Sequence, residues 1–367
     1  MSDQFCNAQA GPADLFDSRF DDTAVSQSSQ AAAEALDPRV LARELQAFRT
    51  PSTGRSGLEV AITLVPFLAL FAVMLFAVEA SYFLVLALFP LTGLLLLRLF
   101  IIQHDCGHGA FLPGRAGNDW LGRAMGVFTL TPYDCWRRSH ALHHAATGNL
   151  DARGVGDVDT LTVSEFYGRG RMGRVMYRVY RHPVVLLGLG PIYLFLLRHR
   201  LPVGLMKEGA VYWISAMATN AVTLAILGVL AYIFGIGTTA LVFFPVLLMA
   251  ASTGVWLFYI QHQFEDAHWN SREDWSFHDA ALGGSSHLDL PAALRWFTGN
   301  IGVHHVHHLA SRIPFYRLQE VLKAYPSLKT MNRFTAVDTL PTLRLALWDE
   351  AQRRLVTFTE AARLQAK

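Results

Sequence analysis

Charged residues are scarce in this chain of 367 residues. They make up 16% of the sequence, whereas apolar residues make up 52%; soluble domains carry roughly 25% charged residues. A soluble fold of this composition would leave much apolar surface in water, so we expect part of the chain to face the hydrocarbon of a bilayer. The net charge of +2 is also small, and the arginines lie beside apolar segments, which argues against a nucleic-acid-binding protein.

Cysteine is rare as well, with only Cys6, Cys106 and Cys135 in the sequence. Three widely spaced cysteines exclude a disulfide framework and fit a reducing compartment. The absence of any cysteine cluster also argues against an iron–sulfur cluster or a structural zinc site.

The first 37 residues lack the basic start and the apolar core of a secretory signal. They are rich in Ser, Ala, Gln and Asp, which predicts a disordered tail over residues 1–37. Asp37 and Pro38 then form the pattern of a helix N-cap followed by a first-turn proline. The helix that follows is amphipathic, and it lies either on the membrane surface or against the rest of the protein.

Four segments have the roughly 20 apolar residues that a membrane-spanning helix needs. They form two tight hairpins, 58–78 with 81–102 and 210–234 with 239–260. None of the 31 Lys and Arg residues lies in either hairpin turn, so the positive-inside rule predicts that both termini and the long central loop are cytoplasmic. A fifth apolar run, 184–197, is short and has basic residues on both sides, and we expect an interfacial or re-entrant helix there.

The 15 histidines are concentrated in three clusters, at 104–108, 140–144 and 304–308. Within each cluster, histidines recur at i, i+3 or i+4, which places their rings on one face of a helix. Such convergent neutral imidazoles are good ligands for Fe, Zn or Cu. His262, directly after the fourth span, occupies a position equivalent to that of His104 after the second.

Eight or nine histidines exceed the four ligands of a zinc site or the six of an octahedral site, so the sequence predicts two metal ions. Cys106 faces a different side of its helix and is expected to pack in the interior. The carboxylates of Asp105, Glu265 and Asp266 either accept hydrogen bonds from the ligand histidines or are solvated charges, and the sequence leaves both alternatives open.

Residues 104–111, 140–151 and 299–309, the last followed by Arg312-Ile313-Pro314, resemble the three histidine boxes of membrane fatty-acid desaturases. The likeness runs from about Leu58 to Leu318, is closest to bacterial acyl-lipid desaturases, and includes residues 261–266. It implies that two non-haem irons are bound by the eight box histidines, which would also be the catalytic residues, with His262 as a ninth ligand. The box histidines are His104, His108, His140, His143, His144, His304, His307 and His308. His305 matches no ligand position and is expected to be a bystander.

The expected fold class is therefore an all-α membrane protein, with four transmembrane helices in two hairpins and a cytoplasmic helical cap that holds the di-iron site. Residues 38–318 would form the desaturase domain and residues 319–367 a cytoplasmic helical tail. The localisation implied is the plasma or inner membrane, with the active site on the cytoplasmic side.

The resemblance implies that an acyl lipid receives a cis double bond, with O2 as co-substrate. No nicotinamide fingerprint or fused haem module is evident in the sequence, so two electrons are expected from an external ferredoxin or cytochrome. A basic group, Arg137, Arg138, Arg169, Arg171 and Arg174, would either dock this donor or contact anionic lipid.

Two positions depart from related chains. Phe258 stands where the animal acyl-CoA branch has an asparagine that reaches iron through water, and Asp159 stands where related chains often have a bulky apolar residue. Two rival functions remain: a hydroxylase, alkane monooxygenase or ketolase on the same scaffold, and a non-enzymatic metal transporter. The transporter is disfavoured because the four predicted spans contain no histidine.

Overall fold

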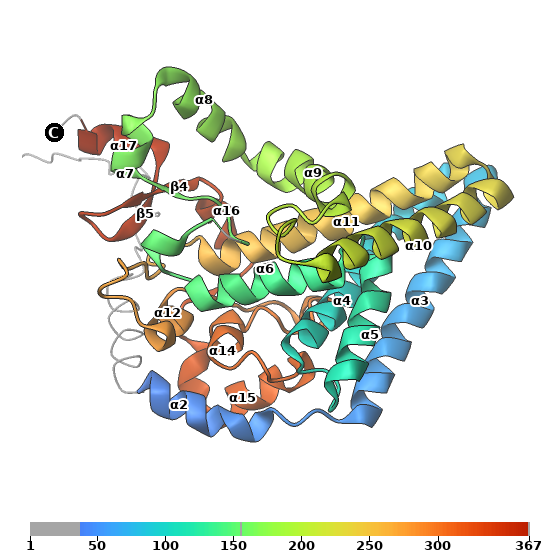
Figure 1. Cartoon of the computed structure of the whole chain (residues 1–367), viewed down its shortest axis with the longest axis horizontal. Helices are drawn as coiled ribbons and strands as arrows, with labels where there is room; N and C mark the ends of the chain where they lie inside the picture. The colour runs from blue at the N-terminus through green and yellow to red at the C-terminus, as the bar shows by residue number, and fades with distance from the viewer. Residues whose placement is uncertain (1–36, 155, 366–367) are drawn as a thin grey trace, which may run out of the picture.

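The computed structural model describes residues 37–154 and 156–365. The disordered tail predicted for residues 1–37 lies outside this range except for Asp37. Four long helices dominate the described part, and each is long and apolar enough to cross a membrane (Figure 1). They are α3 (Thr53–Ala80), α4 (Tyr82–His108), α10 (Ala210–Phe234) and α11 (Ile236–His262).

These helices form the two expected hairpins, but they are longer than the predicted spans. The turn between α3 and α4 is Ser81 alone, and the turn between α10 and α11 is Gly235, whose φ of 84° is a conformation that glycine adopts without strain. At the other end, α4 and α11 continue through His108 and His262. The first histidine cluster is therefore part of a spanning helix, because the apolar pattern ends before the helix does.

Helices α4 and α11 pack closely against each other at Gly93. A Cβ atom at this position would lie 2.7 Å from the Cβ of Met249, so only glycine permits this approach. The hairpins converge at their turns and separate toward the other end (Figure 1). The space between the separated ends is filled by the cap that carries the remaining histidines.

A bent segment precedes the second hairpin. Helix α8 (Arg171–Tyr180) and the stretch Val185–Arg200 meet at 62°. The stretch consists of the π-helix η3 (Val185–Leu189), α9 (Gly190–Leu196) and η4 (Arg198–Arg200). A bent pair of this kind is either one broken span or a re-entrant segment, so the interfacial or re-entrant helix stays a prediction.

The cap is built from short helices. Near the N-terminus lie α2 (Pro38–Glu44) and η1 (Leu45–Phe48). The central loop contributes α5 (Arg115–Phe128), α6 (Tyr133–Ala146), η2 (Leu150–Ala152) and α7 (Val163–Gly168). After α11 follow α12 (Phe277–Gly283), α13 (Ala292–Phe297), α14 (His304–Leu309), η5 (Phe315–Arg317), α15 (Leu318–Ala324), η6 (Pro326–Lys329), α16 (Thr339–Thr342) and α17 (Phe358–Gln365).

The amphipathic helix near the N-terminus packs on the protein. The Asp37 side chain caps α2 by accepting a hydrogen bond from the Arg39 amide at 2.8 Å, as its pattern predicts. Leu41 and Leu45 are buried in the main core, and Glu44 accepts a hydrogen bond from Tyr325 at 3.0 Å. The sequence left open whether this helix lies on the membrane surface or against the protein. In the structure its apolar face packs against the cap.

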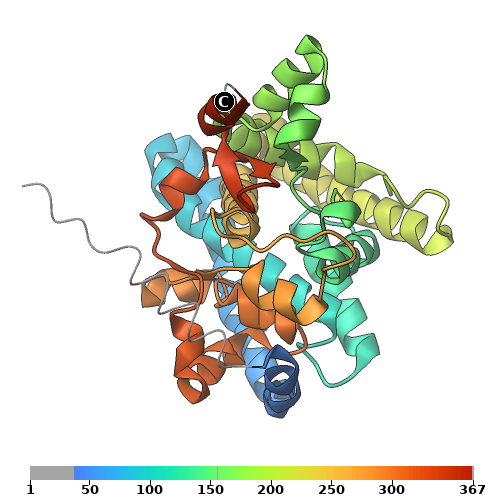
Figure 2. The same ribbon diagram turned by 90° about the vertical axis from the view of Figure 1, so that its left-hand side faces the viewer.

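The sequence predicted a purely helical tail over residues 319–367. This prediction is wrong, because the segment contains three strands. Strand β4 (Leu345–Asp349) pairs antiparallel with β5 (Arg354–Thr357) and parallel with β1 (Leu161–Thr162) of the central loop. Strand β3 (Arg333–Phe334) pairs with β2 (His287–Leu288). The hairpin of β4 and β5, together with α17, lies on the opposite side of the cap from α2 (Figure 2). Trp348 is buried with Trp269, so the hairpin covers the segment that follows α11.

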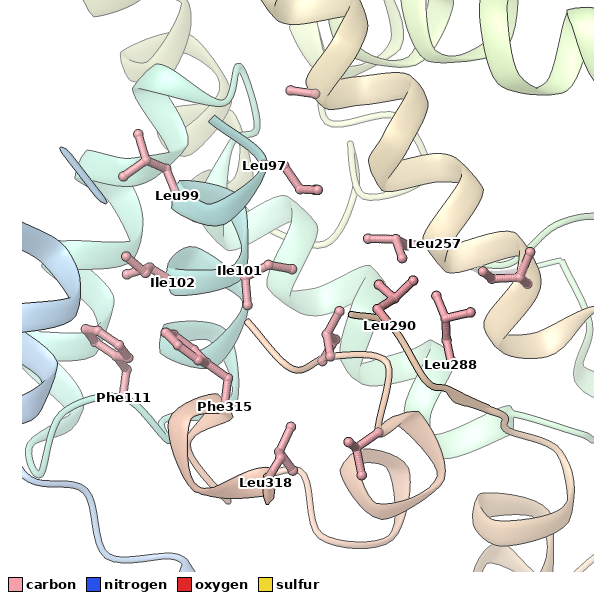
Figure 3. Packing of buried hydrophobic residues seen from close by; sticks show 14 of the residues in the cluster. Leu97, Leu99, Ile101, Ile102, Phe111, Leu257, Leu288, Leu290, Phe315 and Leu318 are labelled. Carbon is pink, nitrogen blue, oxygen red and sulfur yellow. The ribbon is translucent and has the colours of Figure 1, made fainter. Parts of the chain in front are cut away.

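The main core lies where the spanning helices enter the cap. Leu99 and Ile102 near the end of α4 pack in one buried cluster with Leu257 of α11 and Phe315 of η5 (Figure 3). Next to this core, the buried Arg98 forms an ion pair with Glu59 of α3 and lies 4.1 Å from the ring centre of Trp296 in α13. These contacts fasten the segment that carries the third histidine cluster to the ends of α3 and α4.

Candidate metal centre

The nine histidines predicted as ligands converge at the cap end of the spanning helices. Their ring nitrogens form two groups, and within each group the nitrogens lie within 4.8 Å of one another. Group one contains His104, His108, His140, His144 and His307. Group two contains His143, His262, His304 and His308.

Helices α6 and α14 each supply both groups. On α6, His140 and His144 are four residues apart and face group one, whereas His143 faces group two. On α14, His304 and His308 face group two and His307 faces group one. Because histidines at i and i+4 share a helix face and i+3 lies beside them, one short helix can serve two adjacent centres. The two groups therefore form one assembly, in which the rings of His144 and His308 stack at 4.0 Å.

The spanning helices complete each group at its membrane side. Helix α4 supplies His104 and His108 to group one, and α11 supplies His262 to group two. His262 thus takes the place on α11 that the first cluster takes on α4, as the sequence indicated, but it belongs to group two.

The Nε2 atoms are spaced as ligands of one metal ion would be. In group one, the Nε2 atoms of His140 and His108 are 3.1 Å apart, and those of His307 and His144 are 3.2 Å apart. In group two, the Nε2 atom of His262 lies 3.1 Å from that of His143 and 3.0 Å from that of His304. Two nitrogens at right angles on a metal with bonds of about 2.1 Å are separated by about 3 Å.

Hydrogen bonds at the Nδ1 atoms leave Nε2 free to bind metal. His262 Nδ1 lies 3.2 Å from the carbonyl oxygen of Gly284, which can only accept, so the ring proton is on Nδ1. His104 Nδ1 lies 3.2 Å from the Asp105 carboxylate and is fixed in the same way. A hydrogen bond at one ring nitrogen sets the tautomer and presents the lone pair of the other.

Burial keeps the cap histidines neutral. It lowers the pKa of His143 to about 3, and neighbouring His104 and His108 lower it further. Burial also places the pKa values of His140, His144 and His307 well below the ordinary range. His304 and His308 of α14 are shifted in the same direction by the same cause. Neutral imidazoles are the form that binds metal, so the donor set fits transition-metal ions.

Of the three carboxylates considered from the sequence, only Asp105 contacts a histidine. Its second oxygen accepts a hydrogen bond from the Phe315 amide at 2.6 Å, which ties η5 to α4. Glu265 is exposed and pairs with Arg354 at 2.5 Å, and Asp266 is exposed as well. Cys106 is buried in the apolar core, as expected for a packing residue.

Two residues near the centre were singled out in the sequence without being assigned as ligands. His305 belongs to neither group, and its buried Nε2 donates to the carbonyl oxygen of Leu328 at 3.0 Å. Phe258 lies against group two, with its ring centre 5.0 Å from that of His143 and 5.4 Å from that of His262. An apolar ring thus occupies the α11 position that is an asparagine in the animal acyl-CoA branch.

Trp136 is a contact residue that sequence reasoning missed. Its ring stacks on His140 at 4.6 Å and lies 5.7 Å from His104. Gly107 makes room for it, because a Cβ there would lie 2.7 Å from the indole. The available signal was spacing: Trp136 precedes His140 by four residues, so the two rings share one face of α6.

Asp157 was also missed, although it lies near group two. It follows α6 in the loop before β1 and lines a small cavity together with His143. Burial raises the pKa of the Asp157 carboxyl, whereas His262 and Arg181 act in the opposite direction. The sequence offers no sign of this proximity, because other aspartates lie in the same loop and nothing local distinguishes Asp157 from them.

Comparison with known proteins identifies the family. Residues 80–331 match the family model for fatty acid desaturase. A protein named "Fatty acid desaturase" from Bacillus subtilis is 40% identical over 320 residues, which cover 87% of this chain and 90% of the relative. An "sn-1 acyl-lipid omega-3 desaturase (ferredoxin)" from Synechocystis is 32% identical over 250 residues, which cover 63% of this chain and 64% of the relative. With its histidine groups at the ends of four apolar helices, the chain belongs to the fatty acid desaturase family, whose members are membrane-bound.

Proposed function

We propose that this protein is an acyl-lipid desaturase that introduces a cis double bond into an acyl chain. Residues 38–318 would form the catalytic domain, with two non-haem irons held by the nine histidines. The observation that carries the proposal is the pair of adjacent all-imidazole groups, five and four histidines, at the cap end of the spanning helices. Only a site for two metal ions explains why α6 and α14 each divide their histidines between the groups.

The reaction consumes one O2 and two electrons. Two hydrogens leave adjacent methylenes, and O2 is reduced to two waters with two electrons and two protons from outside. When bound, the two irons supply the strongly oxidising O2 chemistry that removal of hydrogen from an unactivated methylene requires.

The protein's residues hold the ligands in place and keep water out. Asp105 and the Gly284 carbonyl orient His104 and His262. Trp136 and Phe258 cover the two groups with apolar surface. A dry, rigid surrounding of this kind favours oxidation of the bound chain over side reactions with solvent.

The position of the site supports a membrane lipid as substrate. Groups one and two begin at the last residues of α4 and α11, so an acyl chain can reach them without crossing water. The Synechocystis relatives are named as acyl-lipid and oleoyl-lipid desaturases, which favours the same substrate class here.

An external ferredoxin-type donor is favoured by the relatives whose names include ferredoxin. The basic group suggested for its docking is partly used within the protein: Arg137 pairs with Asp119 at 2.6 Å, and Arg138 lies 3.8 Å from Glu208. On α8, Arg171 and Arg174 flank an apolar face on which Met172 and Met176 are exposed. A basic amphipathic helix of this kind is typical of membrane surfaces, so we assign this region to anionic lipid. On the positive-inside rule, we further propose that the cap and both termini face the cytoplasm.

Lipid analysis tests the proposal. The chain is expressed in a bacterial host together with a ferredoxin and its reductase, and the acyl chains are measured by gas chromatography and mass spectrometry. New unsaturated chains, absent with a His108→Ala variant, are expected. Hydroxylated chains would instead support the related hydroxylase function. Protein that holds two irons per chain but never turns over with O2 and reductant would support a metal-binding role without catalysis.

A further inference from the structure

Group one has a carboxylate behind one of its histidines. Asp105 follows His104 in α4, and its oxygen accepts the Nδ1–H of that ring at 3.2 Å. No equivalent direct contact is present in group two among the described residues. One carboxylate, that of Asp157, lines a cavity together with a histidine of group two.

The loop that carries Asp157 is pressed against α6. A Cβ atom at Gly156 would lie 2.8 Å from the carbonyl oxygen of Ser139 and 3.3 Å from the Cβ of His143. Gly156 also has a φ of 71°, which favours glycine. Both requirements hold the backbone next to His143, so the following residue is placed beside this ligand.

Asp157 and His143 line the same cavity, which has a volume of about 10 Å³. This is about the volume that a single water molecule needs. None of the other eight histidines lines the cavity, and the Nε2 atom of His143 faces His262 at 3.1 Å. Because Nε2 faces His262, Nδ1 is the ring nitrogen of His143 that is left for a contact within this cavity.

The Asp157 carboxylate is free to accept a further hydrogen bond. Among the residues that the structure describes, its hydrogen-bond partner is the Val158 amide, which donates to Oδ1 at 2.7 Å. Within residues 37–154 and 156–365, no cation forms an ion pair with it: Arg153 pairs with Glu165, and Arg181 donates to Tyr259 and Gln263. Arg153 lines the same cavity, so positive charge lies near the Asp157 carboxylate, which lowers the cost of burying it, without occupying its oxygens.

We propose that Asp157 is the positioning residue of group two: through one water in this cavity, its carboxylate accepts the Nδ1–H of His143. It does for His143 what Asp105 does for His104. The bond fixes the tautomer that directs the His143 Nε2 lone pair at the metal. The carboxylate also adds negative charge beside the group that has four imidazoles in place of five.

This inference rests on the proposed function only in requiring that group two binds a metal ion. Carboxylates that hold a ligand histidine typically contribute about 10- to 100-fold in metal affinity. The expected effect of losing Asp157 is therefore a weakening of one metal site by that factor, with the other site unchanged.

Titration of the metal-free full-length protein with Co²⁺ tests this. The variants are Asp157→Asn, which keeps the shape and removes the charge, and Asp157→Glu, whose carboxylate can reach the cavity. Asp159→Asn is the matched control, because Asp159 is exposed in the same loop and contacts Tyr180 and Arg181 only through its backbone. Visible absorption reports the coordination of each Co²⁺, and thermal unfolding reports the fold.

For Asp157→Asn we expect one Co²⁺ site weakened by about 10- to 100-fold with an altered spectrum and an unchanged melting temperature. Asp157→Glu should retain affinity within a few-fold, and Asp159→Asn should match the wild type. Two tight sites with the wild-type spectrum in Asp157→Asn would overturn the proposal. So would a loss of both sites together with a lower melting temperature in every Asp157 variant, since that pattern indicates a purely structural residue. A wild type that binds two Co²⁺ but yields no unsaturated lipid in cells would contradict the proposed function alone.

Discussion

The two histidine groups are built from the same helices, yet one has five imidazoles and the other has four. The difference arises on the spanning helices. In α4, His104 precedes His108 by one helical turn, and both join group one. In α11, the residue one turn before His262 is Phe258, whose ring packs against group two. One helical position therefore separates a five-histidine group from a four-histidine group.

The number of ligands in each group is therefore set by the spanning helices, whereas the pairing of the groups is set by the cap. Helices α6 and α14 contribute three histidines each, divided between the groups in opposite proportions. A metal bound at group two has fewer imidazoles, so it has more need of other oxygen or nitrogen donors and of charge from neighbouring residues. We expect group two to be the more easily emptied of the two.

Variants that each lack one histidine ligand should show most strongly that group two loses its metal more easily than group one. His108→Ala leaves four imidazoles in group one, and His304→Ala leaves three in group two. Both variants should abolish desaturation, because the proposed reaction requires a metal ion at each group. Iron measured by mass spectrometry should fall further in His304→Ala than in His108→Ala, and His307→Ala should resemble His108→Ala.

All three variants should still insert in the membrane, since the four apolar helices are unchanged. Membrane fractionation provides this control. Full activity in His108→Ala or His307→Ala would contradict the two-metal assignment, and equal iron loss in all three would contradict the inequality of the groups.

The next largest effect is expected from Gly107→Ala, which acts on group one through a neighbour. The added methyl would lie 2.7 Å from the Trp136 ring, which must then move away from His140. Overpacking of this kind costs about 1–3 kcal/mol in the free energy of unfolding. Thermal unfolding and Co²⁺ titration should show a less stable protein with a weakened group one. Gly114→Ala is the control, because a Cβ there meets nothing within 4 Å; a variant at Gly107 that behaves like this control would exclude a positioning role for Trp136.

The sequence predicts much of this site because its signals are local. The four spans, the three clusters and His262 all follow from apolar length and from helical spacing. The i, i+4 spacing of His140 and His144 also predicts that they share a face. Whether His143 joins them or a second centre depends on how α6 lies against α4 and α11, which is a tertiary relation that spacing along one helix cannot supply.

The features that could not be predicted depend on distant partners. The segment around Leu345 and Leu355 is rich in Leu, Ala and Arg, which favour helix. It forms β4 and β5 because it pairs with β1 and buries Trp348 against Trp269. Asp157 is similar, since only the packing of its loop against α6 brings it to His143.

A substitution at Phe258 should make the two groups more alike. Phe258→Asn places an amide oxygen one turn before His262, beside His143. We expect a several-fold tighter second Co²⁺ site and a changed absorption spectrum, because an added oxygen donor compensates for the missing imidazole. Phe258→Leu is the control, since it remains apolar; an Asn variant indistinguishable from it would show that this position does not reach the metal.

The smallest effect on metal binding is expected from His305→Ala, although the histidine is fully buried and lies between ligands in α14. Its ring contacts the Leu328 carbonyl, lies 5.7 Å from that of His287 and belongs to neither group. Removing it leaves a cavity and an unpaired carbonyl, which should lower the free energy of unfolding by about 1–3 kcal/mol. Iron content should remain at two per chain, and desaturation should persist at reduced protein yield. A variant without activity that has lost iron but keeps its melting temperature would make His305 a tenth histidine ligand and contradict its exclusion from the two groups.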